Sequence, residues 1–388
     1  MKIALTAERL WDGSGFLDRP LVLIEDGIVA ALTTQDASEI PTEAERMDLP
    51  GATLAPSFFD VHIHGAAGHD CMEATPAALA AMGGFLASRG TASFLATTVT
   101  APIDASLRAL NGLAKLIAAP QRGACARPLG IHLEGPFLSH AKRGVHPPQE
   151  LVAPSIALFD RFFEAAEGHV RLMTLAPELP GAVELAVHAT ARGVRVSLGH
   201  SNATAAETRA AMAAGAVSAT HTFNAMRTLD HREPGILGVV LTDDSLYAEL
   251  ICDGVHTAPE MVRLWWRAKG AQRALLVTDA MSATGMPDGE YQLGGIAVQV
   301  ANGKAMSGGV LAGSVLTLDR ALSNFLAFTG AKLEEGLRLL TRNPAVLTGL
   351  DVSALRVGQP ANLAAVSAAG KLLGSVVNGA VATRNQPL

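Results

Sequence analysis

Short apolar runs rich in β-forming residues alternate with alanine-rich helical runs from about residue 54 to residue 345. The short runs are bounded by Gly, Pro or polar residues, which is typical of buried strands. The helical runs, such as 103–118 and 204–213, begin or end at Pro, Gly or capping residues. Repeated strand-then-helix units predict a parallel (β/α)8 barrel. The eight expected strands are 58–63, 92–99, 129–133, 170–175, 194–198, 217–222, 246–252 and 274–278.

The two ends of the chain have a different pattern, in which residues alternate or run apolar between Asp-Gly and Asn-Gly pairs. Such pairs favour tight turns between antiparallel strands. We therefore expect an α/β protein with two units: a (β/α)8 catalytic barrel over 54–349, and a small β-sandwich formed by 1–53 together with 350–388. The strands expected at the ends are 2–10, 20–25, 28–33, 361–366 and 371–377.

Two further elements are expected after the eighth strand. Residues 291–300, followed by a turn at Asn302-Gly303, predict an inserted hairpin. A last barrel helix is expected near 333–340.

Composition narrows the class of protein. The chain has 388 residues, of which 49% are apolar and 17% charged, so much of it must be buried in a large core. Its net charge is −6, and no basic run is interleaved with aromatic residues, which argues against a nucleic-acid partner. No apolar stretch reaches the roughly 18 residues that cross a bilayer. Three widely spaced cysteines and the polar residues Thr6, Glu8 and Arg9 near the N-terminus favour a cytoplasmic protein.

Potential metal ligands and proton-transfer groups follow six of the eight expected strands. In a parallel barrel the working groups project from the carboxyl ends of the strands, so these side chains should meet at one mouth. They are Asp60, His62 and His64 after the first strand, His132 and Glu134 on the third, His200 after the fifth, His221 on the sixth, Asp253 and His256 after the seventh, and Asp279 after the eighth.

His62 and His64 are separated by one residue, which places both imidazoles on the same face of a strand. They could share a metal ion, or they could be a hydrogen-bonded pair at the barrel mouth. Glu134, His200 and His221 supply one carboxylate and two imidazoles from three strands, which is the usual makeup of a catalytic zinc site.

The other polar residues allow two interpretations. His132 shares a strand face with Glu134 but lies deeper, which favours a supporting or core role. Asp60 could be a cap or turn residue, and Asp253 an ordinary loop residue. Asp279 follows a wholly apolar strand, where a carboxylate is costly to bury unless it meets a cation or a proton donor.

Several segments, in order along the barrel, resemble N-acetylglucosamine-6-phosphate deacetylases, a family of the amidohydrolase superfamily. HLEGPF, GHSNAT and HTFNAM together are specific to that family. The segments are APSFFDVHIHG (55–65), HLEGPFLS (132–139), KRGVH (142–146), LAPE (175–178), SLGHSNAT (197–204), THTFNAM (220–226), REPG (232–235), DGVH (253–256), LVTDA (276–280) and LAGS (311–314).

The resemblance implies hydrolysis of the acetamide of N-acetyl-D-glucosamine 6-phosphate, with Asp279 as the acid/base catalyst and His146 against the acetamido group. It implies a metal held by Glu134, His200 and His221, most often Zn²⁺, with Fe²⁺ or another divalent ion as alternatives. It also implies a homodimer in which Arg232 reaches the neighbouring site; without the resemblance, Arg232 reads as a solvated loop charge. The implied substrate-binding residues are Val145, His146, Asn224, Ala225, Arg232, Asp253, His256, Leu311, Ala312 and Gly313.

The intact His62 and His64 allow a second metal, so one or two ions per subunit are expected. No lysine ends an expected strand, which makes Glu134 the carboxylate placed to bridge two ions and disfavours dihydroorotase or hydantoinase chemistry. The alternatives are a deacetylase of N-acetylgalactosamine 6-phosphate, of an unphosphorylated N-acetyl sugar or of an N-acyl amino acid, or a catalytically silent metal-binding scaffold.

Overall fold

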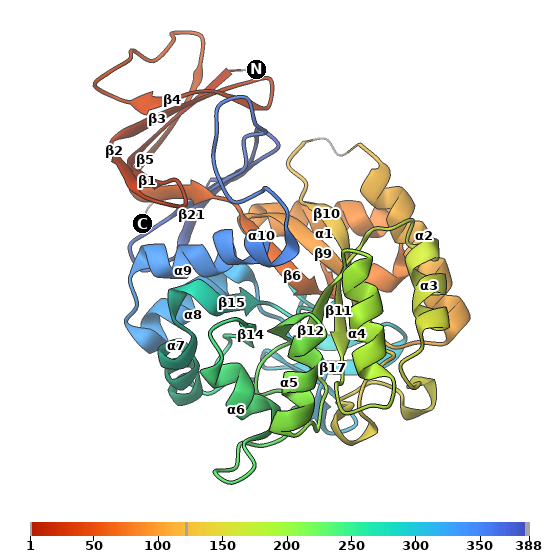
Figure 1. Ribbon diagram of the computed structural model, residues 1–388. Helices are drawn as coiled ribbons and strands as arrows, with labels where there is room; N and C mark the ends of the chain where they lie inside the picture. Colours follow the sequence, from red (N-terminus) through yellow and green to blue (C-terminus); the bar gives the residue numbers. More distant parts are fainter. Residues whose placement is uncertain (1, 121–122, 385–388) are drawn as a thin grey trace.

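Eight parallel strands form a nearly closed barrel in the computed structural model, which describes residues 2–120 and 123–384 (Figure 1). The first and last strands meet through backbone hydrogen bonds from the amide of Asp279 to the carbonyl of His62 (2.9 Å) and from the amide of His64 to the carbonyl of Ala280 (2.8 Å). The predicted barrel is thereby confirmed. Its strands are β6 (Phe58–Ile63), β9 (Thr91–Thr98), β10 (Arg127–Glu134), β11 (Val170–Leu175), β12 (Arg195–Leu198), β13 (Ala216–Ala219), β14 (Tyr247–Ile251) and β15 (Ala274–Val277).

Helices surround the barrel because the strands are apolar on both faces and must be covered on the outside. Thr204, where the run 204–213 is expected to begin, is a helix N-cap, and so is Thr75; their hydroxyls accept from the amides of Glu207 and Ala78. The helices are α1 (Pro76–Ser88), α2 (Ile103–Ala118), α3 (Ile156–Ala165), α4 (Ala182–Ala191), α5 (Ala205–Ala213), α6 (Gly235–Thr242), α7 (Pro259–Arg273), α8 (Leu318–Thr329), α9 (Leu333–Leu340) and α10 (Arg342–Thr348), with short 3-10 turns at Cys71–Glu73, His140–Lys142 and Pro148–Glu150.

The two ends of the chain build one mixed sheet beside the barrel (Figure 1). The long β5 (Glu45–Pro56) pairs in parallel with β1 (Lys2–Trp11) and antiparallel with β20 (Leu363–Val366), so it joins the N-terminal strands to the C-terminal ones. The turns at Gly27 and Gly379 belong to hairpins at opposite ends of the strand order, yet they touch, and a Cβ on Gly379 would lie 2.1 Å from the Cα of Gly27. The strands are β1 (Lys2–Trp11), β2 (Phe16–Asp18), β3 (Pro20–Glu25), β4 (Ile28–Thr34), β5 (Glu45–Pro56), β20 (Leu363–Val366), β21 (Leu372–Val377) and β22 (Ala380–Arg384).

A four-stranded antiparallel sheet is inserted after β15 and contributes to the barrel mouth. The hairpin predicted over 291–300 is confirmed, and the chain turns within it at Gly294 and Gly295, which take positive φ (+54° and +91°). The turn at Asn302-Gly303 is present, between the second and third strands. The strands are β16 (Gly289–Leu293), β17 (Ile296–Ala301), β18 (Lys304–Ser307) and β19 (Val310–Leu311); a small hairpin, β7 (Gly65–Ala66) and β8 (His69–Asp70), follows β6.

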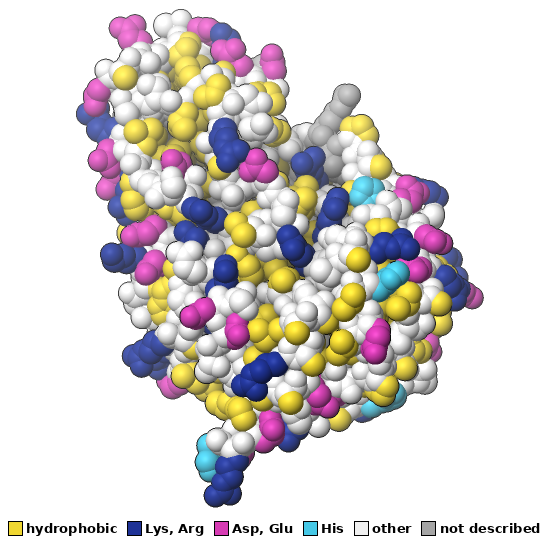
Figure 2. All heavy atoms as spheres, viewed as in Figure 1, with side chains coloured by type: hydrophobic (Ala, Val, Ile, Leu, Met, Phe, Trp, Pro, Cys, Tyr) yellow, Lys and Arg dark blue, Asp and Glu magenta, His cyan; other side chains and the backbone are white. Residues whose placement is uncertain are grey.

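The visible surface carries acidic and basic side chains in mixed order rather than in one patch (Figure 2). Within residues 2–120 and 123–384, no helix has the length and apolar content that a membrane span requires.

Candidate active site

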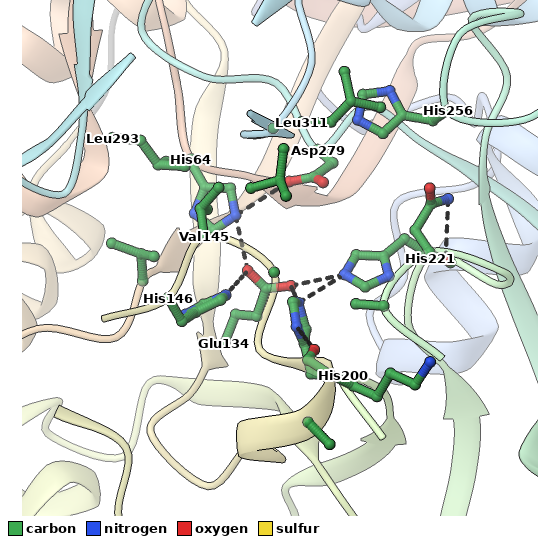
Figure 3. Close-up of a pocket in the computed structure, with 18 residues that line it drawn as sticks. His64, Glu134, Val145, His146, His200, His221, His256, Asp279, Leu293 and Leu311 are labelled. Atoms are coloured by element: carbon green, nitrogen blue, oxygen red, sulfur yellow. Dashed lines mark hydrogen bonds and ion pairs between the residues drawn. The ribbon is translucent and has the colours of Figure 1, made fainter. Parts of the chain in front are cut away.

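The carboxyl ends of the barrel strands bring together two groups of side chains that could hold a metal ion, and Figure 3 shows all of them except His62. In the first group, Nε2 of His221 lies 3.1 Å from Oε1 of Glu134 and 3.1 Å from Nε2 of His200. Nε2 of His200 is 3.3 Å from the same carboxylate oxygen. One carboxylate and two imidazoles thus converge on one point, as in a divalent metal site.

The second group consists of His62, His64 and Asp279. Nε2 of His64 lies 3.2 Å from Oδ1 of Asp279, and Nε2 of His62 lies 3.4 Å from Nε2 of His64. Glu134 joins the two groups, because its Oε2 is 3.0 Å from Nε2 of His64 while its Oε1 faces the first group. In Figure 3 the interactions fan out from Glu134. The arrangement can therefore hold one divalent ion or two bridged by Glu134.

The electrostatics of the two groups differ. Burial disfavours a charged ring and lowers the pKa of His200 to about 4. Burial also acts on His64, but the carboxylates of Asp279 and Glu134 outweigh it and raise its pKa to about 9. The two carboxylates thus draw positive charge toward this spot. An imidazole that ligates a cation must give up its proton, so ion uptake here releases protons.

Hydrogen bonds behind the rings aim them at the centre. Nδ1 of His200 lies 2.9 Å from the carbonyl oxygen of Lys142. A carbonyl can only accept, so this nitrogen carries the proton and Nε2 of the neutral ring offers a lone pair to the centre. On β6, Nδ1 of His62 faces the carboxylate of Glu249 at 3.3 Å in the same way.

Three of the six ligand-type residues sit in left-handed backbone. His200, His221 and Asp279 have φ of +47°, +31° and +50°. Such conformations cost on the order of 1 kcal/mol or more for residues with a Cβ and persist where the surroundings enforce them. Here the carbonyl of His200 accepts from the amide of Ser139 (3.0 Å), and that of Asp279 from the amide of Ser314 (2.7 Å). The chain turns at each strand end, and the side chain is left pointing inward.

His146 lies beside this centre without belonging to either group. Its Nδ1 is 2.8 Å from Oγ1 of Thr100 and accepts from the Thr100 amide at 3.4 Å. Because that nitrogen accepts, the neutral ring carries its proton on Nε2, which lies 3.6 Å from Oε2 of Glu134. His146 therefore presents an N–H donor toward the centre.

A cavity of about 340 Å³ opens above the two groups. Its far wall includes His256, whose Nδ1 lies 2.6 Å from Oδ2 of Asp253. The loop residue Asp253 thus orients the histidine. The expected site residues that line the cavity are His64, Glu134, Val145, His146, His200, His221, Asn224, Ala225, His256, Asp279, Leu311 and Gly313.

Four expected site residues do not line the cavity. His62 lies beneath it, fully buried, and Asp253 acts through His256. Ala312 is buried, with its amide bonded to Ala305. Arg232 is exposed, on the segment between β13 and α6 that includes a loop projecting away from the barrel (Figure 1). Within a single chain, the structure does not bring Arg232 to the site.

His132 and Asp60, for which the sequence allows either a structural or a functional role, both make contacts that support the barrel. His132 is buried and bonds through Nε2 to Oγ1 of Thr174 (2.8 Å), outside both ligand groups. Asp60 accepts from the hydroxyl of Thr278 (2.5 Å), which ties β6 to the end of β15. Burial raises the pKa of Asp60 to about 7. Both residues support the mouth from below.

Sequence reasoning missed Glu249, Thr100 and Leu293. Glu249 interrupts the apolar run 246–252, and the cost of burying a carboxylate inside a strand is a signal that could have found it. Thr100 and Leu293 carry no such signal, because their value lies in contacts with His146 and the cavity that only the fold creates.

Comparisons with known proteins agree with this geometry. The model of the amidohydrolase family matches residues 53–382. The chain is 38% identical over 371 residues to an N-acetylgalactosamine-6-phosphate deacetylase of Escherichia coli O157:H7, covering 94% of this chain and 95% of the relative. It is 35% identical over 363 residues to an N-acetylglucosamine-6-phosphate deacetylase of Bacillus subtilis, covering 92% and 91%.

A solved structure is similar over nearly the whole chain. A mutant N-acetyl-D-glucosamine-6-phosphate deacetylase of Mycobacterium smegmatis, in complex with N-acetyl-D-glucosamine-6-phosphate, superimposes with a TM-score of 0.90 at 35% identity, covering 98% of this chain and 99% of that one. The chain belongs to the amidohydrolase family. Within it, the chain groups with the amino sugar 6-phosphate deacetylases, which confirms the resemblance seen in the sequence.

Proposed function

We propose that the protein hydrolyses the acetamide of N-acetyl-D-glucosamine 6-phosphate to D-glucosamine 6-phosphate and acetate. The observation that carries this proposal is the meeting of Glu134, His200, His221 and Asp279 at the floor of one cavity. The relatives named for this activity, at 35–38% identity over most of the chain, support the choice of substrate.

The donor set fits a divalent metal ion. Histidine nitrogens and carboxylate oxygens are ligands that zinc accepts, and Fe²⁺ accepts them too. Glu134, His200 and His221 would hold the principal ion, and His62, His64 and Asp279 a second one. A bound divalent ion polarises a carbonyl and lowers the pKa of water toward 7.

Asp279 is placed to move the proton of the reaction. Its carboxylate is largely buried but reaches the cavity. Burial raises the pKa of this carboxyl, but the ring of His62 and the hydrogen bond to His64 outweigh it, and the pKa lies below its ordinary value. In the proposed reaction Asp279 takes a proton from the attacking water and gives it to the departing amine.

His146 supplies the complementary donor. Its Nε2–H faces the centre, where it would donate to the acetyl oxygen as negative charge develops on it. Thr100 holds the ring in the orientation and tautomer that this role needs.

The sugar phosphate would extend toward His256 and Asn224 on the outer wall. The exposed Arg232, which has no role in its own chain's cavity, is available to a neighbouring copy, and we propose a homodimer in which it contacts the partner's substrate. The free thiols of Cys71 and Cys252 support a cytoplasmic location.

The test is acetate release by the purified protein, with its metal content measured, across a panel of substrates. We expect N-acetylglucosamine 6-phosphate to exceed unphosphorylated N-acetylglucosamine and N-acetyl amino acids. No acetate from any phosphorylated amino sugar, with metal bound, would overturn the proposal in favour of a silent scaffold.

N-Acetylgalactosamine 6-phosphate is a second candidate, because a 38% identical relative is named for it. The two substrates are epimers, so they present the same acetamide to the metal-ligating groups. The ratio of kcat/KM for the two epimers, measured under identical metal loading, decides between them.

A further inference from the structure

Glu249 is a buried carboxylate that the proposed reaction leaves without a role. It lies on β14, fully buried, and its side chain reaches His62 on β6 across the barrel interior, since β15 stands between these strands. No lysine or arginine in the described ranges forms an ion pair with it; its ion-pair partner is the ring of His62. Its second oxygen, Oε1, has no hydrogen-bond partner among the described residues.

One oxygen of Glu249 contacts both ligand groups. Oε2 lies 3.3 Å from Nδ1 of His62 and accepts from the amide of His221 at 3.4 Å. His221 belongs to the first group, and its backbone takes the strained φ of +31°. Glu249 therefore supports the ring of one ligand and the backbone of another.

The contact with His62 determines which ring nitrogen faces the centre. A carboxylate only accepts, so Nδ1 of His62 carries the proton and Nε2 is left as the lone pair. Nε2 points at Oε1 of Glu134 (3.3 Å) and at Oδ1 of Asp279 (3.5 Å). His64, by contrast, has no partner on its Nδ1 in the described part of the chain, so within the second group this support falls on His62.

The negative charge of Glu249 also supports a role in metal binding. An isolated buried carboxylate costs several kcal/mol unless positive charge compensates it. Two divalent ions near Glu134 and Asp279 would leave excess positive charge in the barrel mouth, and a third carboxylate behind the ligands offsets it. A carboxylate behind a metal-ligating histidine commonly strengthens metal binding by 10- to 100-fold.

We propose that Glu249 is the positioning residue that makes His62 a metal ligand, and that it thereby allows the chain to hold a second divalent ion between His62, His64 and Asp279. This inference rests on the proposed function as a metal-dependent amidohydrolase. It concerns only how many ions are bound and how tightly.

The experiment measures zinc stoichiometry and affinity by competition with a chromophoric chelator, together with elemental analysis. We expect two equivalents for the natural chain. In Glu249→Leu one equivalent should bind about 10- to 100-fold more weakly, and the other unchanged. Glu249→Gln, whose amide oxygen still accepts but carries no charge, should weaken the same equivalent by about tenfold and guards against misfolding of the leucine variant.

Two controls locate the effect. Tyr247→Phe changes the same strand at a hydroxyl bonded to Arg273 and should keep both equivalents. In a His62→Asn background, which has already lost this ligand, adding Glu249→Leu should change affinity less than twofold, because the two residues act together.

Three outcomes would overturn the inference: two equivalents of unchanged affinity in both Glu249 variants, equal weakening of both equivalents, or a natural chain that binds one. None of these outcomes touches the proposed hydrolysis of the acetamide, which acetate release tests separately.

Discussion

The barrel mouth and the sheet at the chain ends bury side chains of opposite kinds. At the mouth, His62, Glu134 and Glu249 are ionisable and almost fully hidden from solvent. The core of the terminal sheet is apolar throughout, with Leu54 and Val376 among its buried residues. Burying charge costs free energy, whereas burying apolar surface supplies it at about 25 cal/mol per Å². The comparison teaches that the mouth is built for chemistry and the sheet for stability, so substitutions in them should have separable effects.

The largest effect is expected at the mouth. Asp279→Asn removes the proton acceptor but keeps an oxygen near the site, so kcat/KM should fall by about 10³- to 10⁴-fold while one ion stays bound and the melting temperature hardly changes. Acetate release and elemental analysis measure this. Asp160→Asn, at a surface ion pair with Arg192, is the matched control. Robust turnover by Asp279→Asn would remove the catalytic assignment.

The sheet should show the reverse behaviour. Leu54→Ala in β5 leaves a cavity in a fully buried core, so the free energy of unfolding should fall by about 2–5 kcal/mol. Below the unfolding transition kcat/KM should be unchanged. Urea denaturation and acetate release on the same sample test both parts. A large loss of kcat/KM in folded protein would show that the two regions are coupled.

A substitution at Lys269 tests whether a buried charged group away from the barrel mouth contributes to activity. Its ammonium group donates to the carbonyls of Val240 and Asp243, far from the mouth, and burial lowers its pKa to about 8. The folded chain therefore loses this proton between about pH 8 and 10.5, where the unfolded chain keeps it, so stability gains from this lysine as pH rises through that window. Lys269→Met should lack a gain of about 2 kcal/mol, with activity unchanged.

That contribution is obtained from urea denaturation of both proteins at pH 7.5 and pH 10. An identical pH dependence in the two proteins would show that the lysine is not responsible.

The smallest effect is expected for Thr100, which supports His146 at the barrel mouth. Thr100→Val removes the hydroxyl partner of His146 but keeps the backbone amide contact. A lost hydrogen bond of about 1 kcal/mol should lower kcat about fivefold with little change in KM. Steady-state kinetics measures both constants, and a change confined to KM would argue that Thr100 serves binding instead.

Elements whose limits are set by the local sequence could be predicted from apolar runs and helical periodicity. β6, β11 and α2 begin and end where apolar runs and periodicity place them. β5 was not predicted, because Pro50 and Gly51 argue against a strand and its pairing with β1 is made only in the fold. α6 was missed because it is apolar on every side and so has no helical period.

Some residues of the candidate site can likewise be predicted from the sequence, and others cannot. Ligand-type residues such as Glu134 and His200 are visible because they follow strands, and barrel geometry brings strand ends together. Glu249 becomes meaningful only when it meets His62, which is 187 positions away. Arg232 is exposed in one chain, so the role proposed for it would require a second copy, which a single sequence does not place.

The group formed by His62, His64 and Asp279 lies at the junction of β6 and β15, where the barrel closes. His62 and His64 stand on one side of that junction and Asp279 on the other, next to the two backbone bonds that close the circle. A cation bound there would link the first barrel strand to the last, so the barrel could not open at this point without releasing the ion. Removal of such an ion should therefore increase the rate of amide hydrogen exchange at residues 62–64 and 279–280 before it affects the rest of the barrel.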